Sequence, residues 1–274
     1  MLLHKYIKSE YWWKTLSRCE IKVSKPSEMN DPFDSFGVFS GEFGANAKRN
    51  LKSKGHFLKN MHDHTAVDET FRILCLTDAE INDDRSEMLF WSHYTNGGDG
   101  VRITFEIQDP SEFSRPKGFI DFVKYGTIVP RLDGALYEEN QKAEIKNFLQ
   151  ECIWTKGHAW EYEHEVRLLF PLKGLKTRTY TKMEKKGIVK RVRYDVIKFS
   201  PLSVKEVVFG PKIKPHVVKR KARRLVPIYG STSVFKIAIM MDRYKYSNEP
   251  LWDDFSYNLN LSNEDRLSMI GWDN

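Results

Sequence analysis

The stretch from Trp154 to Phe170, WTKGHAWEYEHEVRLLF, constrains the fold of this chain more than any other. Two kinds of side chain alternate along it, with charged residues at one set of positions and mostly apolar residues at the other: Glu161, Glu163, Glu165 and Arg167 against Trp160, Tyr162, His164, Val166 and Leu168. A period of two is typical of a β-strand whose two faces meet different surroundings. The aromatic and β-branched content also favours a strand. We therefore predict a strand from Tyr162 to Phe170.

Three carboxylates on a single face, even with one arginine beside them, repel one another unless the face is solvated, paired or used in chemistry. Two interpretations follow, an exposed sheet edge with an arginine partner or the wall of an active site, and the pattern alone leaves both open. Glu165 lies two residues from Arg167 on this face. An ion pair between these two residues would hold Glu165 ionised.

The length of 274 residues suits one large domain or two small ones, and a hydrophobic content of 41% is sufficient for a sizeable core. We expect a single catalytic-type domain over residues 1–246, followed by an acidic C-terminal tail over 247–274. The opening MLLHKYI lacks the basic and apolar regions of a signal peptide, and no apolar run reaches membrane-spanning length. The three cysteines have neither disulfide-framework nor zinc-ligand spacing. A cytoplasmic protein without a membrane partner is the expectation.

Strands and helices are mixed along the chain, and predicted strands often follow one another directly. The predicted strands cover residues 2–7, 19–23, 71–76, 101–107, 119–129, 162–170, 187–199, 204–209 and 233–241. Helices are predicted after Ser9 and over 136–153 and 215–225. This order predicts an α+β fold with a mixed, mostly antiparallel sheet and flanking helices, rather than a regular βαβ sheet.

The net charge of +7 is concentrated in one block. Between Lys173 and Arg224 there are 18 Lys and Arg residues against only Glu184, Asp195 and Glu206. Such a block attracts polyanions through their phosphates, although a solvated basic face that maintains solubility is an equal alternative. RNA or DNA is the candidate partner, and the candidate contacts are Lys190, Arg191, Arg193, Lys219, Arg220, Arg223 and Arg224.

Polar and aromatic residues form four clusters that are far apart in the sequence. They are His4 with Tyr6, Asn30 with Asp31 and Asp34, the run Trp91 to Tyr94, and the alternating row from Glu161 to Arg167. Each cluster alone has a structural explanation, such as a sheet edge, a turn, or a core aromatic with a hydrogen-bonded tip. Chemistry requires the clusters to converge in one cleft.

Several of these motifs together resemble a known family. They are KPSEMNDPFD at 25–34, LCLT at 74–77, FWSHY at 90–94, WEYEHEVRLLF at 160–170 and VKEVVFGPKI at 204–213. In this order they resemble the bacterial domain-of-unknown-function family DUF2971, and the resemblance runs from about Leu2 to about Met241. The family name implies no activity.

The N-terminal order of strand, helix and strand is similar at the level of fold to ADP-ribosyltransferase toxins, which modify nucleic acids or proteins with NAD. This resemblance implies an ADP-ribosyltransferase-like fold and an enzyme that acts as a toxin or phage-defence effector, with an antitoxin or regulator as a further partner. It implies Glu163 or Glu165 as the catalytic carboxylate, and the position of Arg167 on the same face as Glu165 favours Glu165 in that role with Glu163 as its helper. The implied NAD contacts are His4, Tyr6, Arg72, Ser92, His93, Tyr94 and Arg167, and Arg102 is a further candidate for the pyrophosphate. No metal is expected for this chemistry.

Two alternatives belong to other classes of protein. In a metal-dependent nuclease, Asp31 or Asp34 with Glu163, Glu165 and Lys156 would bind a divalent cation beside a phosphate. In a non-catalytic polyanion-binding module, the glutamates would pair with neighbouring Lys or Arg and the basic helix would dock the ligand.

Overall fold

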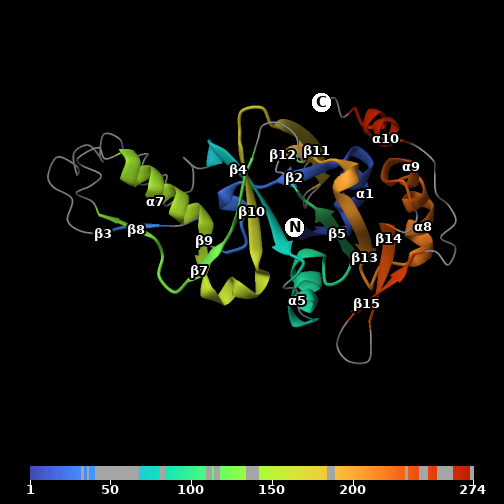
Figure 1. The fold of residues 1–274 in the computed structure, drawn as a ribbon, viewed down its shortest axis with the longest axis horizontal. Coiled ribbons are helices and arrows are strands. Elements are labelled where there is room, and N and C mark those ends of the chain that lie inside the picture. The colour runs from blue at the N-terminus through green and yellow to red at the C-terminus, as the bar shows by residue number, and fades with distance from the viewer. Residues whose placement is uncertain are drawn as a thin grey trace.

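The computed structural model of the protein describes residues 1–31, 34–35, 37–40, 68–80, 84–108, 113, 118–133, 142–183, 189–231, 234–240, 246–251 and 262–271. Its largest element is an eight-stranded sheet with the order β15-β14-β13-β5-β1-β4-β10-β6 (Figure 1). All neighbouring strands are antiparallel except β13 and β14. The strands of this sheet are β1 Leu2–Lys8, β4 Phe71–Asp78, β5 Gly100–Glu106, β6 Phe119–Phe122, β10 Glu165–Pro171, β13 Val204–Phe209, β14 Phe235–Met240 and β15 Tyr246–Pro250. The predicted α+β class with a mostly antiparallel sheet is confirmed.

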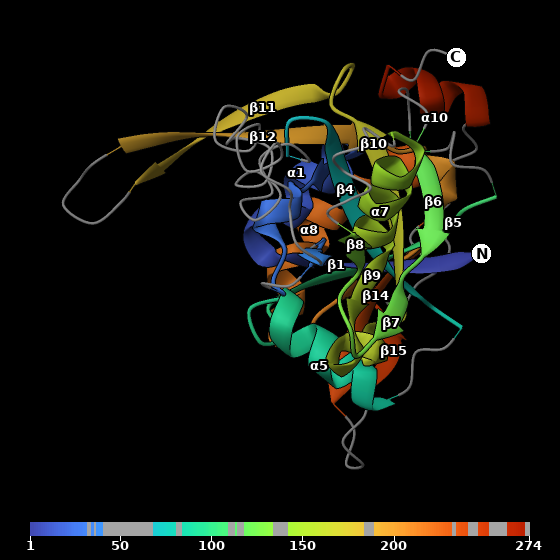
Figure 2. The ribbon, with the colours of Figure 1, turned by 90° about the vertical axis from the view of Figure 1, so that its left-hand side faces the viewer.

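A second, three-stranded sheet has the order β11-β12-β2. Figure 2 shows that β11 and β12 form a long hairpin that extends well away from the rest of the molecule. Two short parallel pairs, β3 with β8 and β7 with β9, complete the strand pairing of the described residues. The bounds of these strands are β2 Glu20–Val23, β3 Val38–Ser40, β7 Lys124–Gly126, β8 Arg131–Asp133, β9 Thr155–Gly157, β11 Lys176–Met183 and β12 Val189–Lys198.

Helices lie around the sheets, and three of them are short 3-10 turns. The helices are α1 Ser9–Arg18, η1 Pro26–Glu28, α5 Asp84–Tyr94, α7 Lys142–Trp154, η3 His158–Glu163, η5 Pro201–Ser203, α8 Pro215–Arg223, α9 Val226–Tyr229 and α10 Asn263–Met269. Among the described residues, no helix is both long enough and apolar enough to cross a membrane.

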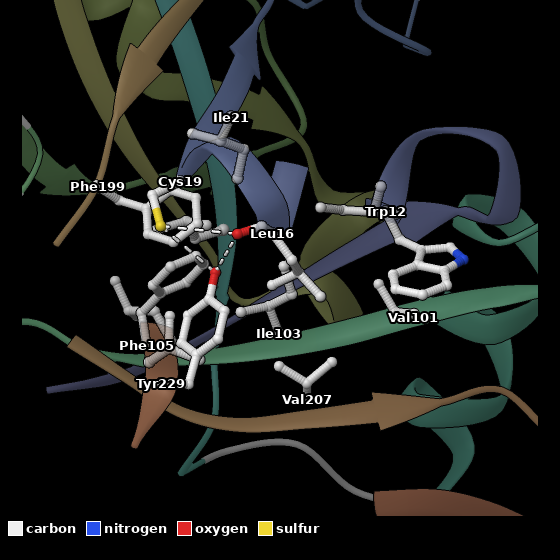
Figure 3. Close-up of a cluster of buried hydrophobic side chains, with 14 of the residues drawn as sticks. Trp12, Leu16, Cys19, Ile21, Val101, Ile103, Phe105, Phe199, Val207 and Tyr229 are labelled. Atoms are coloured by element: carbon white, nitrogen blue, oxygen red, sulfur yellow. Dashed lines mark hydrogen bonds between the residues drawn. The ribbon is translucent and has the colours of Figure 1, made fainter. Parts of the chain in front are cut away.

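The core forms where α1 packs beside β5 and β13. Trp12 and Leu16 are buried on one face of α1, in the same cluster as Ile103 of β5. The helix ends at Cys19, whose backbone is left-handed with φ of +46°. Figure 3 shows the Tyr229 hydroxyl beside this end of the helix, where it donates a hydrogen bond of 2.8 Å to the carbonyl of Leu16. This packing fixes the position of α1 relative to β1, which carries His4 and Tyr6.

The predicted strand from Tyr162 begins later in the structure. Residues 158–163 form the 3-10 helix η3, and β10 starts at Glu165 after His164, which is left-handed with φ of +40°. Strand β10 lies between β4 and β6, and its residues from Glu165 to Phe170 are buried. The exposed-edge interpretation is therefore wrong for Glu163, Glu165 and Arg167, whereas Glu161 is exposed. The reason is that ion pairs, rather than solvent, compensate the charges of Glu165 and Arg167.

The C-terminal region contributes to the main sheet. Strand β15 pairs with β14, and its residues overlap the start of the segment that we expected to be an acidic tail. Helix α10 follows, and Lys198 of β12 donates hydrogen bonds of 3.1 Å and 2.7 Å to the carbonyls of Ile270 and Gly271. The part of the predicted tail at 252–261 and 272–274 lies outside the described residues.

Candidate functional site

A cleft of about 200 Å³ lies beside strands β1, β4 and β10. Three adjacent strands align one residue each at this place, because Thr77 of β4 is the register partner of both His4 of β1 and Glu165 of β10. The side chains that line the cleft come from five different segments of the chain: His4, Lys5, Tyr6, Ser24, Glu28, Met29, Asn30, Asp34, Cys75, Leu76, Thr77, Phe90, Tyr94, Lys156, Glu163 and Glu165.

A network of ion pairs forms the floor of the cleft. Arg167 is fully buried, and its Nε donates to Glu165 Oε1 at 2.8 Å while its Nη2 donates to Asp34 Oδ2 at 2.7 Å. Its Nη1 donates to the carbonyl of Ile153 at 2.5 Å. The ion pair between Glu165 and Arg167 that the sequence indicated is therefore present. Arg167 lies below the cleft rather than in its lining.

Lys156 joins two of the glutamates. Its Nζ lies 2.5 Å from Glu163 Oε2 and 2.9 Å from Glu165 Oε2, and 4.8 Å from the ring centre of Trp160. Burial opposes the charge of this ammonium group, but Glu165 and Glu163 outweigh the effect and raise the pKa of Lys156 above its usual value. Lys156 is thus held as a cation between two carboxylates.

The two glutamates experience opposite electrostatic environments. Burial raises the pKa of Glu163, although Lys156 and the hydroxyl of Tyr94, which donates a hydrogen bond to Glu163 Oε1, partly oppose this effect. Burial also acts to raise the pKa of Glu165, but Arg167 and Lys156 outweigh it and lower that pKa well below 4.5. Neighbouring acids whose pKa values are separated in this way are typical of acid–base and electrostatic roles in catalysis.

The residues from β1 form another wall of the cleft. His4 Nδ1 lies 3.1 Å from Thr104 Oγ1. Burial, together with nearby Arg102, lowers the pKa of His4 from 6.5 to about 3, against an opposing effect of Glu206, so that the ring is neutral near pH 7. Tyr6 stacks on Phe90 of α5 with ring centres 5.1 Å apart. This wall presents aromatic surface and an uncharged imidazole to the cleft.

Other residues that the sequence analysis proposed for NAD lie away from the cleft lining. Ser92 and His93 of α5 are exposed. Arg72 is paired with Asp195 at 2.6 Å. Arg102 is paired with Glu87 at 2.5 Å and with Glu206 at 2.8 Å. The structure therefore brings together His4, Tyr6, Tyr94, Glu163 and Glu165, with Arg167 beneath them.

The residues proposed for nucleic-acid contact fall on two elements. Lys190, Arg191 and Arg193 are exposed on β12 of the projecting hairpin (Figure 2). Lys219, Arg220, Arg223 and Arg224 lie on α8 or directly after it, and all except the half-buried Lys219 are exposed. In the sheet order, β13 and β14 lie at the opposite side of β1 from β10. The buried face of α8 packs in the same hydrophobic cluster as Phe209 and Phe235 of those two strands.

Two lysines contribute more to the site than the sequence patterns indicate. The patterns suggest Lys156 only as part of the metal-dependent alternative, and they do not indicate Lys5. Lys5 Nζ donates to the carbonyl of Cys75 at 2.8 Å beside the cleft. A lysine inside the short and largely apolar predicted strand at residues 2–7 is the sequence signal that could have identified Lys5.

A metal site needs several ligand side chains that converge on one point, and the described cluster does not provide them. Within the described residues, no group of three His, Cys, Asp or Glu side chains has the geometry to hold a metal ion. The oxygens of Asp34, Glu163 and Glu165 instead contact Arg167, Lys156 and the Tyr94 hydroxyl.

Comparison with known proteins supports the resemblance noted in the sequence. The family model described as protein of unknown function (DUF2971) matches residues 90–168, a shorter range than the motifs indicated. No curated protein and no solved structure matches the chain. The matched segment contains Tyr94, Lys156, Glu163, Glu165 and Arg167. Most of the charged cluster thus lies in the part of the chain whose similarity to the DUF2971 family is confirmed.

Proposed function

We propose that the protein is an ADP-ribosyltransferase-like enzyme that cleaves the nicotinamide–ribose bond of NAD and transfers ADP-ribose to a macromolecule. The observation that carries this proposal is the position of Glu163. Its carboxylate lies between the hydroxyl of Tyr94 and the ammonium group of Lys156, in a cleft that His4 and Tyr6 of β1 also line. We further propose that the α+β fold is of the ADP-ribosyltransferase type.

The chemistry needs an anion beside the reacting sugar. When the C–N bond to nicotinamide breaks, its electron pair leaves with the nicotinamide and positive charge develops on the ribose. A carboxylate that accepts a hydrogen bond from the ribose 2′-hydroxyl stabilises this charge. The acceptor then forms a bond to the same carbon and loses a proton. Tyr6, Phe90 and Tyr94 supply aromatic surface for the nicotinamide ring.

The geometry favours an exchange of the two roles that the sequence implied. Both oxygens of Glu165 contact Arg167, and one also contacts Lys156. Glu163 contacts Lys156 and Tyr94, which are themselves cleft residues. We therefore assign Glu163 as the catalytic carboxylate, and Glu165 as a positioning residue that holds Lys156 against it.

The proposal also covers the acceptor of ADP-ribose and the biological role of the protein. A nucleic-acid acceptor would suit the exposed basic residues of β12 and α8, and a toxin or phage-defence effector would need an antitoxin or regulator as a partner. A protein acceptor is the alternative. The proposal requires NAD and no metal.

The test is incubation of the purified protein with NAD labelled in its adenylate half, with and without a chelator, in the presence of RNA, DNA and cell lysate. Release of nicotinamide and transfer of label, both independent of the chelator, are the expected results. Metal-dependent shortening of nucleic acid without NAD turnover would favour the nuclease. If neither reaction occurs while polyanions still bind, the binding module is favoured.

A further inference from the structure

A second hollow adjoins the cleft and has a different character. It is a groove of about 380 Å³ between α1 and the β11–β12 hairpin, and we call it the tyrosine groove. It shares Lys5, Tyr6, Ser24, Glu28 and Tyr94 with the lining of the cleft, so the two spaces lie side by side. A ligand whose reacting end lies beside Glu163 would therefore extend into the tyrosine groove.

One face of α1 forms a wall of this groove. Tyr11, Lys14 and Arg18 line it, and their spacing of three and four residues places them on one side of the helix. Trp12 and Leu16 face the core instead. Because all three groove residues are exposed, they do not stabilise the core.

The opposite wall is aromatic. Tyr180 of β11 and Tyr194 of β12 line the groove with their ring centres 5.7 Å apart in an edge-to-face arrangement. Tyr11 and Tyr180 interact through their hydroxyls, and burial with this interaction raises the pKa of Tyr11 to about 12. Tyrosine rings on both walls provide surfaces on which a nucleobase can stack.

The groove also carries an excess of unpaired positive charge. Its two acids are already engaged, because Glu20 contacts Arg178 at 2.5 Å and Glu28 contacts Lys22 at 2.8 Å. Lys8, Lys14, Arg18 and Arg193 line the same groove and form no salt bridge within the part of the chain that the structure describes. Arg72, Arg102 and Arg167, which the sequence indicated for a pyrophosphate, are all paired with carboxylates. Cations available for phosphate are thus found in the groove.

We propose that the tyrosine groove binds a nucleoside diphosphate group, with its phosphates on Lys14 and Arg18 and its base on the tyrosine rings. In NAD this group is the ADP half, an assignment that rests on the proposed function, whereas binding of ADP itself does not. The groove volume lies within the range of roughly 300–1,000 Å³ that small-ligand sites occupy. A nucleic-acid strand occupies roughly 4–16 nucleotides per binding fold, which needs a longer channel.

The experiment measures binding of ADP to the full chain by titration calorimetry at fixed salt concentration. The Lys14→Gln, Arg18→Gln double variant should bind ADP about tenfold or more weakly, because two charge-assisted contacts are lost. Tyr11→Leu should weaken binding about fivefold or more through loss of stacking. The matched control is the Lys219→Gln, Arg220→Gln double variant of α8, which removes the same charge and should bind ADP as the parent does. Unchanged melting temperatures verify that each variant is folded.

Two results would overturn the inference. The first is that the parent does not bind ADP, and the second is that the groove double variant binds ADP as well as the parent does. If, in the second case, a single-stranded oligonucleotide of about 12 nucleotides loses affinity in the groove variant, the groove is a nucleic-acid site instead. This outcome can be told apart from that of the proposed function. ADP binding that depends on the groove, without NAD cleavage, supports the groove as a nucleotide site and contradicts the proposed enzyme. NAD cleavage with an unchanged KM in the groove variant supports the proposed enzyme and contradicts the groove as its nucleotide site.

Discussion

At the scale of single residues, the electrostatic pairing of Glu163 with Lys156 determines the expected pH dependence. In the proposed reaction the carboxyl group of Glu163 must be ionised to stabilise positive charge on the ribose, and burial raises its pKa above 4.5. The acidic limb of the activity profile should therefore lie above pH 4.5, with activity rising as pH rises. Removal of the cation in Lys156→Gln should move this limb to higher pH, because Lys156 opposes the effect of burial.

The control for this prediction is Lys156→Arg, which keeps a cation beside Glu163. Its acidic limb should stay close to that of the parent even if its rate is lower. A limb that is unchanged in Lys156→Gln would show that Lys156 does not control the ionisation of the catalytic group.

The buried ring of His4 leads to a separate prediction, which concerns the pH dependence of stability rather than of activity. Its pKa is about 3 in the folded protein and 6.5 in the reference state, so between these pH values the unfolded chain binds more protons. The free energy of unfolding should therefore fall as pH falls through this window, by up to roughly 1.4 kcal/mol per pH unit from this one group. His4→Gln should remove that part of the slope between about pH 6.5 and 4.5, where the depressed pKa of Glu165 has no effect.

Chemical denaturation at a series of pH values measures this slope. His93→Gln, which replaces an exposed histidine, is the matched control for the substitution itself. An equal slope in His4→Gln and the parent would contradict the account of a buried neutral ring.

At the scale of elements, the turn between η3 and β10 places Glu163 and Glu165 on the same ammonium group. His164 adopts a left-handed backbone with φ of +40° at this turn. Such a conformation is tolerated by Asn but strained for a β-branched residue. His164→Val should lower the free energy of unfolding by about 1–2 kcal/mol and reduce activity, whereas His164→Asn should remain close to the parent.

Thermal unfolding and nicotinamide release together test this prediction. Equal behaviour of the Val and Asn variants would mean that the left-handed turn is unimportant for placing Glu163.

The sequence predicted some elements correctly and missed others, and β10, α8 and β11 show why. Alternation correctly indicated a strand through Val166 and Leu168, but it extended the strand over Glu163, because a 3-10 turn of mixed polar and aromatic residues also alternates by chance. Helix α8 agrees with its predicted range because proline at its start and basic residues near its end are strong local signals. Strand β11 was not predicted, since it lies in a hairpin that projects from the body and lacks a buried apolar face (Figure 2).

At the scale of the whole molecule, the sheet order creates the site. Strands β1, β4 and β10 are neighbours, although they lie far apart in the sequence, and their register aligns His4, Thr77 and Glu165. The sequence identified the α+β class and most of the clustered residues. It could not identify the order of the strands, because the antiparallel pairing of distant strands depends on the packing of the whole core rather than on local pattern.

The way in which distant segments meet in the fold also determines which of the proposed residues lie in the cleft. The sequence analysis proposed both Arg72 and Tyr94 as NAD contacts, yet Arg72 pairs with Asp195 of β12, in the other sheet, whereas Tyr94 of α5 contacts Glu163 in the cleft. Sequence patterns indicate a polar role but not its partner, since a buried charge is stabilised by whichever opposite charge the fold places beside it.

The most direct test of the central claim is the rate of nicotinamide release from NAD by the parent, Glu163→Gln and Glu161→Gln. The two variants remove one carboxylate each from the same turn, but Glu161 is exposed and pairs with His158 at the surface. We predict that Glu163→Gln lowers kcat/KM about 100-fold or more, because the developing charge on the ribose loses its counterion, and that Glu161→Gln retains nearly full activity. No release by the parent, or full activity in Glu163→Gln, would contradict the account.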